Sequence, residues 1–355
     1  MAVNSTQTVA IVGTGMVAKA HLQSVADLSD KIRLKGVLSR QAERAAVFAH
    51  NASALCGYGV ETYSDIDALA GDADVDWVIV LTPPNARTEI VRKLAAAGKS
   101  ILMEKPVERN LDTARTIVET CEKAGVSLGV VFQHRVRAAS RRLAELIAGD
   151  QLGELAIVEV NVPWWREQSY YDEPGRGTYD RDGGGVLISQ AIHSLDLMLS
   201  LAGRVAEVQA MAHTTLLHKM EAEDYVTAAM RMENGASGSL IASTASFPGD
   251  AESITLHGSK GVAHLQSGIL NLRWHDGREE EFGATATTGG GADPMAFTHE
   301  WHRDIIGNFA DAFARTEAPL VSGRTALNVH ALIDALIESS TKKCAVTVPY
   351  PEFLQ

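Results

Sequence analysis

Short apolar runs alternate with segments of helical pattern in residues 1–132, and this alternation restricts the folds open to the chain. The runs lack the polar alternation of half-exposed strands, which is typical of strands buried on both faces of a parallel sheet. They are Val9–Val12, Leu34–Leu38, Trp77–Leu81, Ile101–Met103 and Val126–Phe132. The helical segments between them are Val17–Leu28, Gln41–His50, Ala86–Ala97 and Leu111–Ala124. This repetition predicts right-handed crossovers and a doubly wound parallel sheet, an α/β domain of the Rossmann type.

The pattern changes from residue 133 onward, where adjacent strands are joined by turn residues such as Asn234-Gly235. Such neighbours pair as an antiparallel sheet. The expected strands are Leu155–Val162, Val205–His213, Tyr225–Met232, Ser237–Ser246, Ser253–Gly258, Val262–Gln266 and Ile269–Trp274. The expected helices are Arg137–Ala148, Glu300–Arg315 and Thr325–Ser340, and Gly289-Gly290-Gly291 is expected to be a loop. We therefore predict two domains, residues 1–132 and residues 133–355, the second of the α+β class.

Charge and composition narrow the functional classes. The net charge of −12 argues against nucleic-acid binding, because an acidic chain repels phosphates. Cys56, Cys121 and Cys344 form no CxxC pair, so neither a zinc ribbon nor a disulfide framework is indicated. Met1–Thr8 lacks the apolar core of a signal peptide, and no apolar run reaches the ~18 residues of a membrane span. We expect a cytoplasmic protein.

The first apolar run ends at Gly13-Thr14-Gly15-Met16-Val17-Ala18, a G-x-G-x-x-A motif between a strand and a helix. Gly13 permits the tight turn, Gly15 lets a pyrophosphate approach the backbone, and Ala18 lets the helix pack closely on the strand. The helix N-terminus then faces the phosphates. The motif predicts a dinucleotide site formed by Gly13, Thr14, Gly15, Met16 and Val17.

The second apolar run ends at Leu38-Ser39-Arg40. An NAD site usually carries an Asp or Glu here to hold the ribose 2′-hydroxyl, and this segment has neither. A small hydroxyl beside the donor fork of an Arg suits a 2′-phosphate instead. Ser39 and Arg40 therefore favour NADP over NAD, although an Arg solvated at a strand end would give the same pattern.

Glu104-Lys105-Pro106 directly follows the fourth apolar run. Ligands of open α/β sheets bind at the carboxyl ends of the strands, so we expect Lys105 in the cleft. Its ammonium can orient a hydroxyl or carbonyl and stabilise developing negative charge. A surface ion pair is the alternative for an isolated tripeptide of this kind.

A glycine hinge, Gly183-Gly184-Gly185, leads into a helical segment that carries Ser189 and His193. These two residues are four apart and would share one face of an α-helix. His193 is a natural base for a hydroxyl proton during hydride transfer, although a single helical His is often structural.

Metal binding is not indicated by the spacing of the histidines. His193 and Asp196 are three residues apart, but a third ligand is not evident. His299 and His302 have the same spacing, and we expect both on a helix surface.

Four motifs follow one another in a characteristic order. They are the glycine motif, Thr82-Pro83-Pro84-Asn85, Glu104-Lys105-Pro106 and the glycine hinge that leads to His193-x-x-Asp196. In order and spacing they resemble the glucose–fructose oxidoreductase/inositol dehydrogenase/rhizopine catabolism (Gfo/Idh/MocA) family over nearly the whole chain. The resemblance implies a Rossmann domain and a second domain with a large, open, mostly antiparallel sheet, through which many members form dimers or tetramers. It also implies NAD(P)-dependent oxidation or reduction of a sugar, polyol or related carbonyl compound.

The resemblance further implies roles for particular residues. Lys105 and His193 match the catalytic lysine and histidine of the family. Gln133 and His134 would border the cleft. The cofactor-binding residues that the resemblance adds are Thr82, Pro83, Pro84, Asn85, Glu104, Lys105 and Gln133.

Two positions depart from the family pattern. Ser189 stands where many family dehydrogenases have an Asp that holds the substrate and tunes the His. Ser189-Gln190 instead resembles a branch that acts on larger or modified sugars. Arg87 stands where many members have a His, and we expect it to alter the rim of the cleft.

The segment Pro163–Thr178, just before the glycine hinge, is dense in Trp, Tyr, Arg and Gly. Aromatic faces pack on the C–H surfaces of sugars, and Arg and Tyr supply hydrogen bonds. We interpret it as a substrate loop, with a packed interdomain or oligomer loop as the alternative. The predicted substrate residues are Lys105, Trp165, Arg166, Tyr171, Ser189, Gln190 and His193.

Together these features predict an NAD(P)-dependent oxidoreductase that acts on CH–OH groups without a metal. Hydride passes between nicotinamide and substrate carbon, His193 exchanges the hydroxyl proton, and Lys105 polarises the oxygen. A non-catalytic NAD(P)-binding sensor is the first alternative, disfavoured because a sensor needs neither Lys105 nor His193. The second is a glycoside-processing enzyme that cycles its NAD internally.

Overall fold

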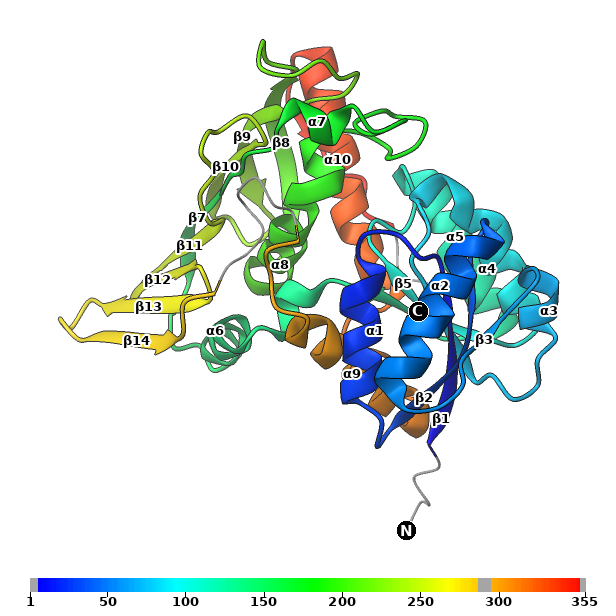
Figure 1. The fold of residues 1–355 in the computed structure, drawn as a ribbon. Coiled ribbons are helices and arrows are strands. Elements are labelled where there is room, and N and C mark those ends of the chain that lie inside the picture. The colour runs from blue at the N-terminus through cyan, green and yellow to red at the C-terminus, as the bar shows by residue number, and fades with distance from the viewer. Residues whose placement is uncertain (1–5, 287–294, 352–355) are drawn as a thin grey trace. The chain divides into compact units, whose positions relative to one another are not determined.

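The computed structural model describes residues 6–286 and 295–351, so the predicted loop Gly289-Gly290-Gly291 lies outside the described residues. The chain divides into two compact units (Figure 1). Unit 1 comprises Met1–Glu108, Asp112–Gln133 and His299–Ala326, and unit 2 comprises Arg109–Leu111, His134–Thr298 and Leu327–Gln355.

Unit 1 contains the parallel sheet that the apolar runs predict, and the Rossmann assignment is confirmed. Its six strands are ordered β3-β2-β1-β4-β5-β6, and all neighbours are parallel. The strands are β1 (Gln7–Val12), β2 (Ile32–Leu38), β3 (Glu61–Thr62), β4 (Trp77–Val80), β5 (Ser100–Glu104) and β6 (Leu128–Val131). Each predicted run forms one strand, whereas the two residues of β3 are too few to carry a pattern.

The direction of the chain reverses between β1 and β4. It runs from β1 outward to β3, returns to β4 beside β1, and continues outward to β6. Because crossovers are right-handed, the helices before and after this reversal cover opposite faces of the sheet. Ligands of such sheets bind at the reversal. The helices are α1 (Ala18–Asp27), α2 (Ala42–Cys56), α3 (Ile66–Ala70), the 3₁₀ helix η1 (Pro84–Ala86), α4 (Arg87–Ala96) and α5 (Leu111–Ala124).

Helix α9 (Glu300–Arg315) belongs to unit 1, although the sequence pattern groups all residues from 133 onward in the second domain. It packs against α1 and β6. The ring of Phe309 meets that of Trp77 edge-on at a centroid distance of 4.9 Å, and both side chains are buried. Lys31 and Asp311 add a partly exposed ion pair of 2.7 Å. Burial of the two rings, more than the ion pair, holds α9 on unit 1.

Unit 2 contains a mixed, mostly antiparallel sheet, as the turn-linked strands predict. Its nine strands are ordered β14-β13-β12-β11-β7-β10-β9-β8-β15, with β7 and β10 parallel. They are β7 (Leu155–Pro163), β8 (Val205–His213), β9 (Tyr225–Met232), β10 (Ser237–Ser243), β11 (Ser253–Gly258), β12 (Gly261–Gln266), β13 (Ile269–Trp274), β14 (Glu279–Gly283) and β15 (Val346–Thr347). The acidic β14 and the two-residue β15 are not predicted, because neither shows apolar alternation.

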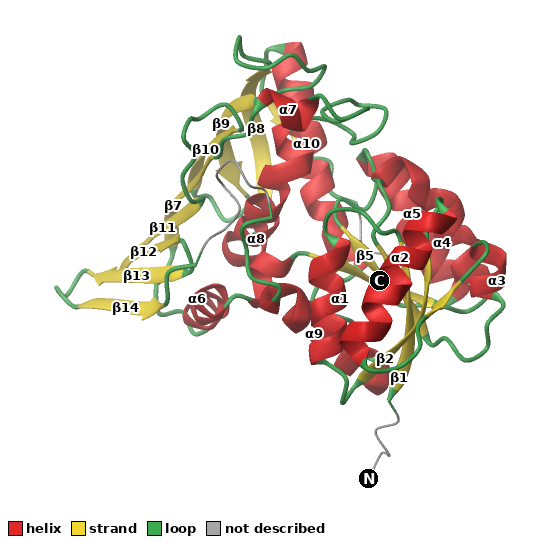
Figure 2. Cartoon of the chain, viewed as in Figure 1, coloured by secondary structure: helices red, strands yellow, loops and turns green. Residues whose placement is uncertain are grey.

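Helices cover one face of this sheet, where α8 packs on β7 and β11 and α6 packs on β12 and β13 (Figure 2). The opposite face carries Ile157, Met211 and Ile241, which are 44%, 56% and 43% exposed. Ile157 and Ile241 lie on the neighbouring strands β7 and β10, and Met211 of β8 and Ile241 both pair with Thr227 of β9. The helices that complete the chain are the 3₁₀ helix η2 (Gln133–Val136), α6 (Ala138–Ala148), α7 (Gln168–Tyr171), the π-helix η3 (Leu187–Ala191), α8 (Ile192–Ala202) and α10 (Gly323–Lys342).

Across residues 6–286 and 295–351, none of the helices combines the length and apolar character that a bilayer span requires.

Phe309→Ala is expected to lower the free energy of unfolding by about 3–5 kcal/mol, because it deletes a buried ring and leaves a cavity beside Trp77. Urea unfolding followed by circular dichroism measures the change. Phe247→Ala is the control, because Phe247 is 75% exposed, and should cost less than about 1 kcal/mol. Equal losses in the two variants would contradict the assignment of α9 to the core of unit 1.

Candidate functional site

Gly13 lies where the chain leaves β1, beside the segment that follows β4. Its N–H donates to the carbonyl of Leu38 at 2.8 Å. Its φ is +104°, and a Cβ at this position would come within 3.0 Å of the carbonyl carbon of Leu81. A larger residue would strain the turn and push it away from the chain after β4. The backbone therefore requires the glycine that the motif places here.

The N-terminus of α1 is open to a ligand. Within the described residues no side chain caps this helix, and the preceding Gly15 and Met16 are exposed. Backbone N–H groups and the helix dipole make such an end favourable for phosphate. The bare turn and the uncapped helix together fit the pyrophosphate of a dinucleotide.

The other predicted cofactor residues also lie in unit 1. Thr14 Oγ1 donates to Ser39 Oγ at 3.1 Å, which joins the glycine turn to the end of β2, and Arg40 beside it is exposed. After β4, Pro83 and Asn85 are exposed, whereas Thr82 is half-buried and Pro84 is buried. Gln133, which follows β6, is 7% exposed. The arrangement therefore groups the loops after β1, β2 and β4 at one edge of the sheet.

The carboxylate of Glu104 is buried at the end of β5 and is hydrogen-bonded on both oxygens. Oε1 accepts from Nε2 of His21 at 2.7 Å and lies 3.4 Å from Nε2 of His302. Oε2 accepts from the backbone N–H of Lys105 at 3.1 Å. Burial alone would raise the pKa of Glu104, but the two imidazoles hold it well below its usual value. Glu104 is therefore ionised and fixes the backbone at Lys105.

His21, Glu104 and His302 bring three ligand atoms within 4.8 Å of one another, the kind of set that could hold a metal ion. In this structure the three residues form a hydrogen-bonded cluster, in which His21 Nε2 donates to the carboxylate. Burial lowers the pKa of His21, which keeps this imidazole neutral and suited to that role. A metal-binding His normally donates its second ring nitrogen to a partner, and Nδ1 of His21 has no hydrogen-bond partner in the described residues.

The prediction that His302 lies on a helix surface is wrong. His302 is 1% exposed, because it occupies the face of α9 that turns toward α1 and Glu104. His299 is partly exposed and pairs with Asp27 at 2.7 Å. Spacing of three residues could not reveal which helix face is covered. The cluster joins residues 21, 104 and 302, so no local sequence signal reports it.

Arg87, which we expect to alter the rim of the cleft, is itself buried and not exposed at a rim. Arg87 is the first residue of α4, but its side chain is only 2% exposed. Its guanidinium turns inward and donates to the carbonyls of Thr82, Glu104 and Pro106. An Arg at the start of a helix usually reaches solvent, and the sequence contains no signal for these backbone acceptors.

In unit 2 the glycine hinge packs tightly on Glu223. A Cβ on Gly185 would overlap the backbone of Glu223, so only glycine fits there. The Glu223 carboxylate accepts from the N–H groups of Gly185 and Leu187, each at 3.1 Å. These contacts fix the start of η3, a π-helical segment that carries Ser189. Ser189 and His193 therefore do not have the regular α-helical offset that their spacing predicts.

His193 lies in the first turn of α8 and stacks on His134, with ring centroids 4.8 Å apart and planes 22° from parallel. Both rings are buried, at 6% and 2% exposure. Arg135 donates to both carboxylate oxygens of Asp196 at 2.6 Å. Burial raises the pKa of Asp196, and the Arg135 charge opposes that shift. Asp196 thus ties η2 to α8 and supports the stacked pair.

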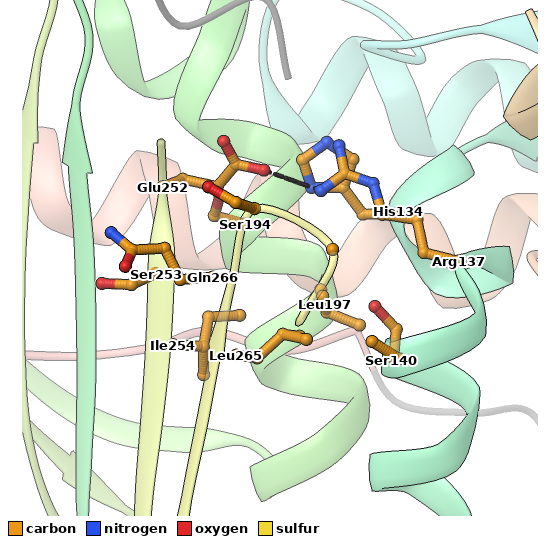
Figure 3. A pocket seen from close by; sticks show the side chains of 13 residues that line it. His134, Arg137, Ser140, Ser194, Leu197, Glu252, Ser253, Ile254, Leu265 and Gln266 are labelled. Carbon is orange, nitrogen blue, oxygen red and sulfur yellow. Dashed lines mark hydrogen bonds and ion pairs between the residues drawn. The ribbon is translucent and has the colours of Figure 1, made fainter. Parts of the chain in front are cut away.

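A small cavity lined by both polar and apolar side chains lies beside His134 (Figure 3). Glu252 Oε1 accepts from Arg137 at 2.7 Å and is 3.9 Å from Nδ1 of His134. Ser194, the residue after His193, also lines the cavity. Its volume of about 20 Å³ has room for a water molecule and not for a sugar. Glu252 therefore lies beside His134 in the fold. The sequence did not indicate this contact, because Glu252 directly precedes β11, far along the chain from His134.

The predicted substrate loop is packed within unit 2. Arg166 is 2% exposed and donates to the carbonyl of Trp165. The hydroxyl of Tyr171 is hydrogen-bonded to Thr244 Oγ1 at 2.6 Å. Trp165 is partly exposed and lies 5.7 Å from His218 between ring centroids. The contacts of Arg166 and Tyr171 are those of a packed loop. Trp165 is the more exposed of the three side chains.

Two family models match the chain. Residues 7–132 match "Oxidoreductase family, NAD-binding Rossmann fold", and residues 140–264 match "GFO/IDH/MocA C-terminal domain".

Known proteins match this chain over nearly its whole length. It is 24% identical to the inositol 2-dehydrogenase of Rhizobium meliloti (strain 1021), over 95% of this chain and 98% of that protein. The WlbA dehydrogenase from Bordetella pertussis, solved with NADH and UDP-GlcNAcA, is 27% identical with a TM-score of 0.82, over 98% of this chain and 100% of that one. A levoglucosan dehydrogenase, solved with NADH and levoglucosan, has the same fold at 21% identity and a TM-score of 0.84, with the same coverage.

Because models for both domains of one family match in order along the chain, and because three of its four motifs follow strands β1, β4 and β5, this protein belongs to the Gfo/Idh/MocA family of oxidoreductases.

Proposed function

We propose that this protein transfers a hydride between NAD(P) and a carbon that bears a hydroxyl or carbonyl group in a sugar or polyol. The observation that carries the proposal is the position of Lys105, directly after β5 in a sheet whose glycine turn fits a dinucleotide. The inositol, levoglucosan and WlbA dehydrogenases among the similar proteins support this substrate class. When bound, the nicotinamide supplies or accepts the hydride.

Two side chains carry the remaining chemistry in this proposal. The Lys105 ammonium polarises the substrate oxygen and stabilises the negative charge that develops on it. His193 takes up or returns the hydroxyl proton. Its burial against His134 holds the ring in one orientation and limits contact with bulk water, which suits a directed proton transfer.

Substrate binding is proposed to use the uncharged polar pair Ser189 and Gln190 together with Trp165. Ser189 Oγ donates to the carbonyl of Gly185 and is paired with Gln190 Oε1, so the pair has a defined orientation. Neutral hydrogen-bonding groups suit sugar hydroxyls, and an indole face suits sugar C–H groups. Arg166 and Tyr171 would support this surface from behind, because their polar groups are hydrogen-bonded to the carbonyl of Trp165 and to Thr244 Oγ1.

The cofactor preference is proposed to be NADP. Arg40 is exposed beside Ser39 at the end of β2, where a carboxylate would otherwise select NAD. The solved neighbours named above contain NADH, so they support a nicotinamide dinucleotide and not this finer choice.

A homo-dimer or homo-tetramer is proposed to form through the face of the unit 2 sheet that carries Ile157, Met211 and Ile241. Exposed aliphatic side chains grouped on one sheet face are typical of protein–protein contacts.

Lys105→Ala is expected to lower kcat for a sugar substrate by about 10²–10³-fold, because it removes the group that stabilises charge on the oxygen. Binding of the reduced cofactor, followed by nicotinamide fluorescence, should remain largely intact. Lys93→Ala is the control, because Lys93 forms a surface ion pair with Asp67. Full activity of Lys105→Ala would overturn the proposed role.

The same assay separates the alternatives. A sensor would bind cofactor without turnover of any sugar, whereas an enzyme that cycles NAD internally would convert a glycoside with no net change in cofactor oxidation state.

Arg40→Ala is expected to weaken NADPH binding by about tenfold, the loss of roughly 1.4 kcal/mol of interaction with a 2′-phosphate, and to change NADH binding little. Fluorescence titration with each cofactor measures the difference. Arg44→Ala, on the exposed surface of α2, is the matched control. Equal effects on the two cofactors would remove the reason for preferring NADP.

Ile241→Asp is expected to shift the protein to a smaller assembly, because a carboxylate cannot be buried in an apolar contact without a partner. Light scattering after size-exclusion chromatography measures the mass. Leu216→Asp provides the control, since Leu216 is 96% exposed in the segment after β8. A monomeric wild-type protein would contradict the proposed assembly directly.

A further inference from the structure

We propose that Arg87 is a positioning residue that holds the backbone on both sides of Lys105 and ties it to the Thr82–Asn85 loop. The inference rests on the proposed function of Lys105. Arg87 itself is not expected to touch substrate, because its side chain is buried in unit 1.

The guanidinium of Arg87 bridges the ends of two neighbouring strands. Nε and Nη2 donate to the carbonyl of Thr82 at 2.9 and 2.7 Å, after β4. Nη1 donates to the carbonyls of Glu104 and Pro106, after β5. The planar fork holds donors on three separate nitrogens in a fixed geometry, whereas the donors of a Lys ammonium all radiate from one nitrogen on a flexible stem.

The site accommodates a buried positive charge, although these hydrogen bonds go to neutral carbonyls. Burial lowers the pKa of Arg87 to about 10, and the charges of Glu104 and Glu108 oppose this shift. The side chain therefore remains protonated at neutral pH. Burying a cation costs free energy that an apolar residue of similar size would avoid. The Arg87 side chain instead fixes the distance between the segments that follow β4 and β5.

These contacts act on the residue proposed to polarise the substrate. Arg87 holds the carbonyls on either side of Lys105, and the Glu104 carboxylate accepts the Lys105 N–H at 3.1 Å. The Lys105 main chain is thus restrained at three points around its Cα. Since a flexible four-carbon stem separates Cα from the ammonium, a restrained Cα narrows the region that the ammonium can reach. The bonds to Thr82 fix that region relative to the Thr82–Asn85 loop, which the family resemblance assigns to cofactor binding.

Arg87→Lys tests this role, with Arg92→Lys as the matched control. Both arginines lie on α4, but Arg92 forms an exposed ion pair with Glu89. Arg87→Lys is expected to lower kcat and kcat/KM together by about 10–100-fold with KM nearly unchanged, because misplacement of a reacting group affects the transition state. Arg92→Lys should match the wild type. Wild-type kcat in Arg87→Lys, at normal expression and thermal stability, would overturn the proposal.

Chemical rescue distinguishes positioning from general support of the fold. In Arg87→Ala, guanidinium ions at concentrations far below those that unfold proteins should restore part of kcat by refilling the site. Sodium at equal ionic strength should not, and Arg92→Ala should not respond to either. Restoration by sodium, or no restoration in a folded Arg87→Ala protein, would count against the proposal.

A measurement without turnover separates this inference from the proposed function. Reductive ¹³C-methylation labels the lysines, and Lys105→Arg identifies the resonance of Lys105. In Arg87→Lys this resonance should shift or broaden while the others stay in place, even if no sugar is turned over. An unchanged Lys105 resonance would overturn the positioning role, whereas a wild-type protein that binds cofactor but oxidises no sugar or polyol would overturn the proposed function alone.

Discussion

The carboxylate of Glu104 is buried at the end of β5, and a buried charge must be hydrogen-bonded to persist in a folded protein. Its partners come from three separate parts of unit 1: His21 on α1, His302 on α9 and the backbone of Lys105. The hydrogen bonds to this one carboxylate therefore hold α1 and α9 at the end of β5. It also fixes the segment in which the proposed catalytic lysine lies. The packing of α9 on Trp77 adds the apolar contact that such a polar cluster cannot supply by itself.

The same principle organises unit 2. The Glu223 carboxylate accepts two N–H groups at the start of η3, and Asp196 binds Arg135 through both of its oxygens. Each buried acid links segments that are distant in sequence. Ser189 and His193 lie between these two anchored positions along the chain. The residues proposed to bind substrate and to transfer the proton are therefore held by hydrogen-bonded segments on both sides. Side chains held in this way keep their orientation without a bound ligand.

Local patterns predicted the regular elements well because burial on both faces of a strand leaves an uninterrupted apolar run. The Val9–Val12 and Trp77–Leu81 runs show this, and β13 was predicted with its observed bounds. Prediction failed where pairing does not depend on apolar pattern. Strand β14 has the sequence Glu-Glu-Glu-Phe-Gly and pairs only at the edge of the sheet, where solvent accepts its charges. The partner of His302, Glu104, lies far away along the chain, and the acceptors of Arg87 are main-chain carbonyls that no residue type reveals.

The sequence by itself determined the doubly wound first sheet, the glycine turn and the order of motifs that identifies the family, because these depend on residues close together along the chain. Only the tertiary structure decided that α9 packs with unit 1, that His302 joins Glu104, and that Arg87 turns inward to three backbone carbonyls. The physical reason is that a side chain's partner is set by which segments burial brings together. Main-chain carbonyls, which every residue carries, leave no trace in the sequence as the acceptors of one particular guanidinium.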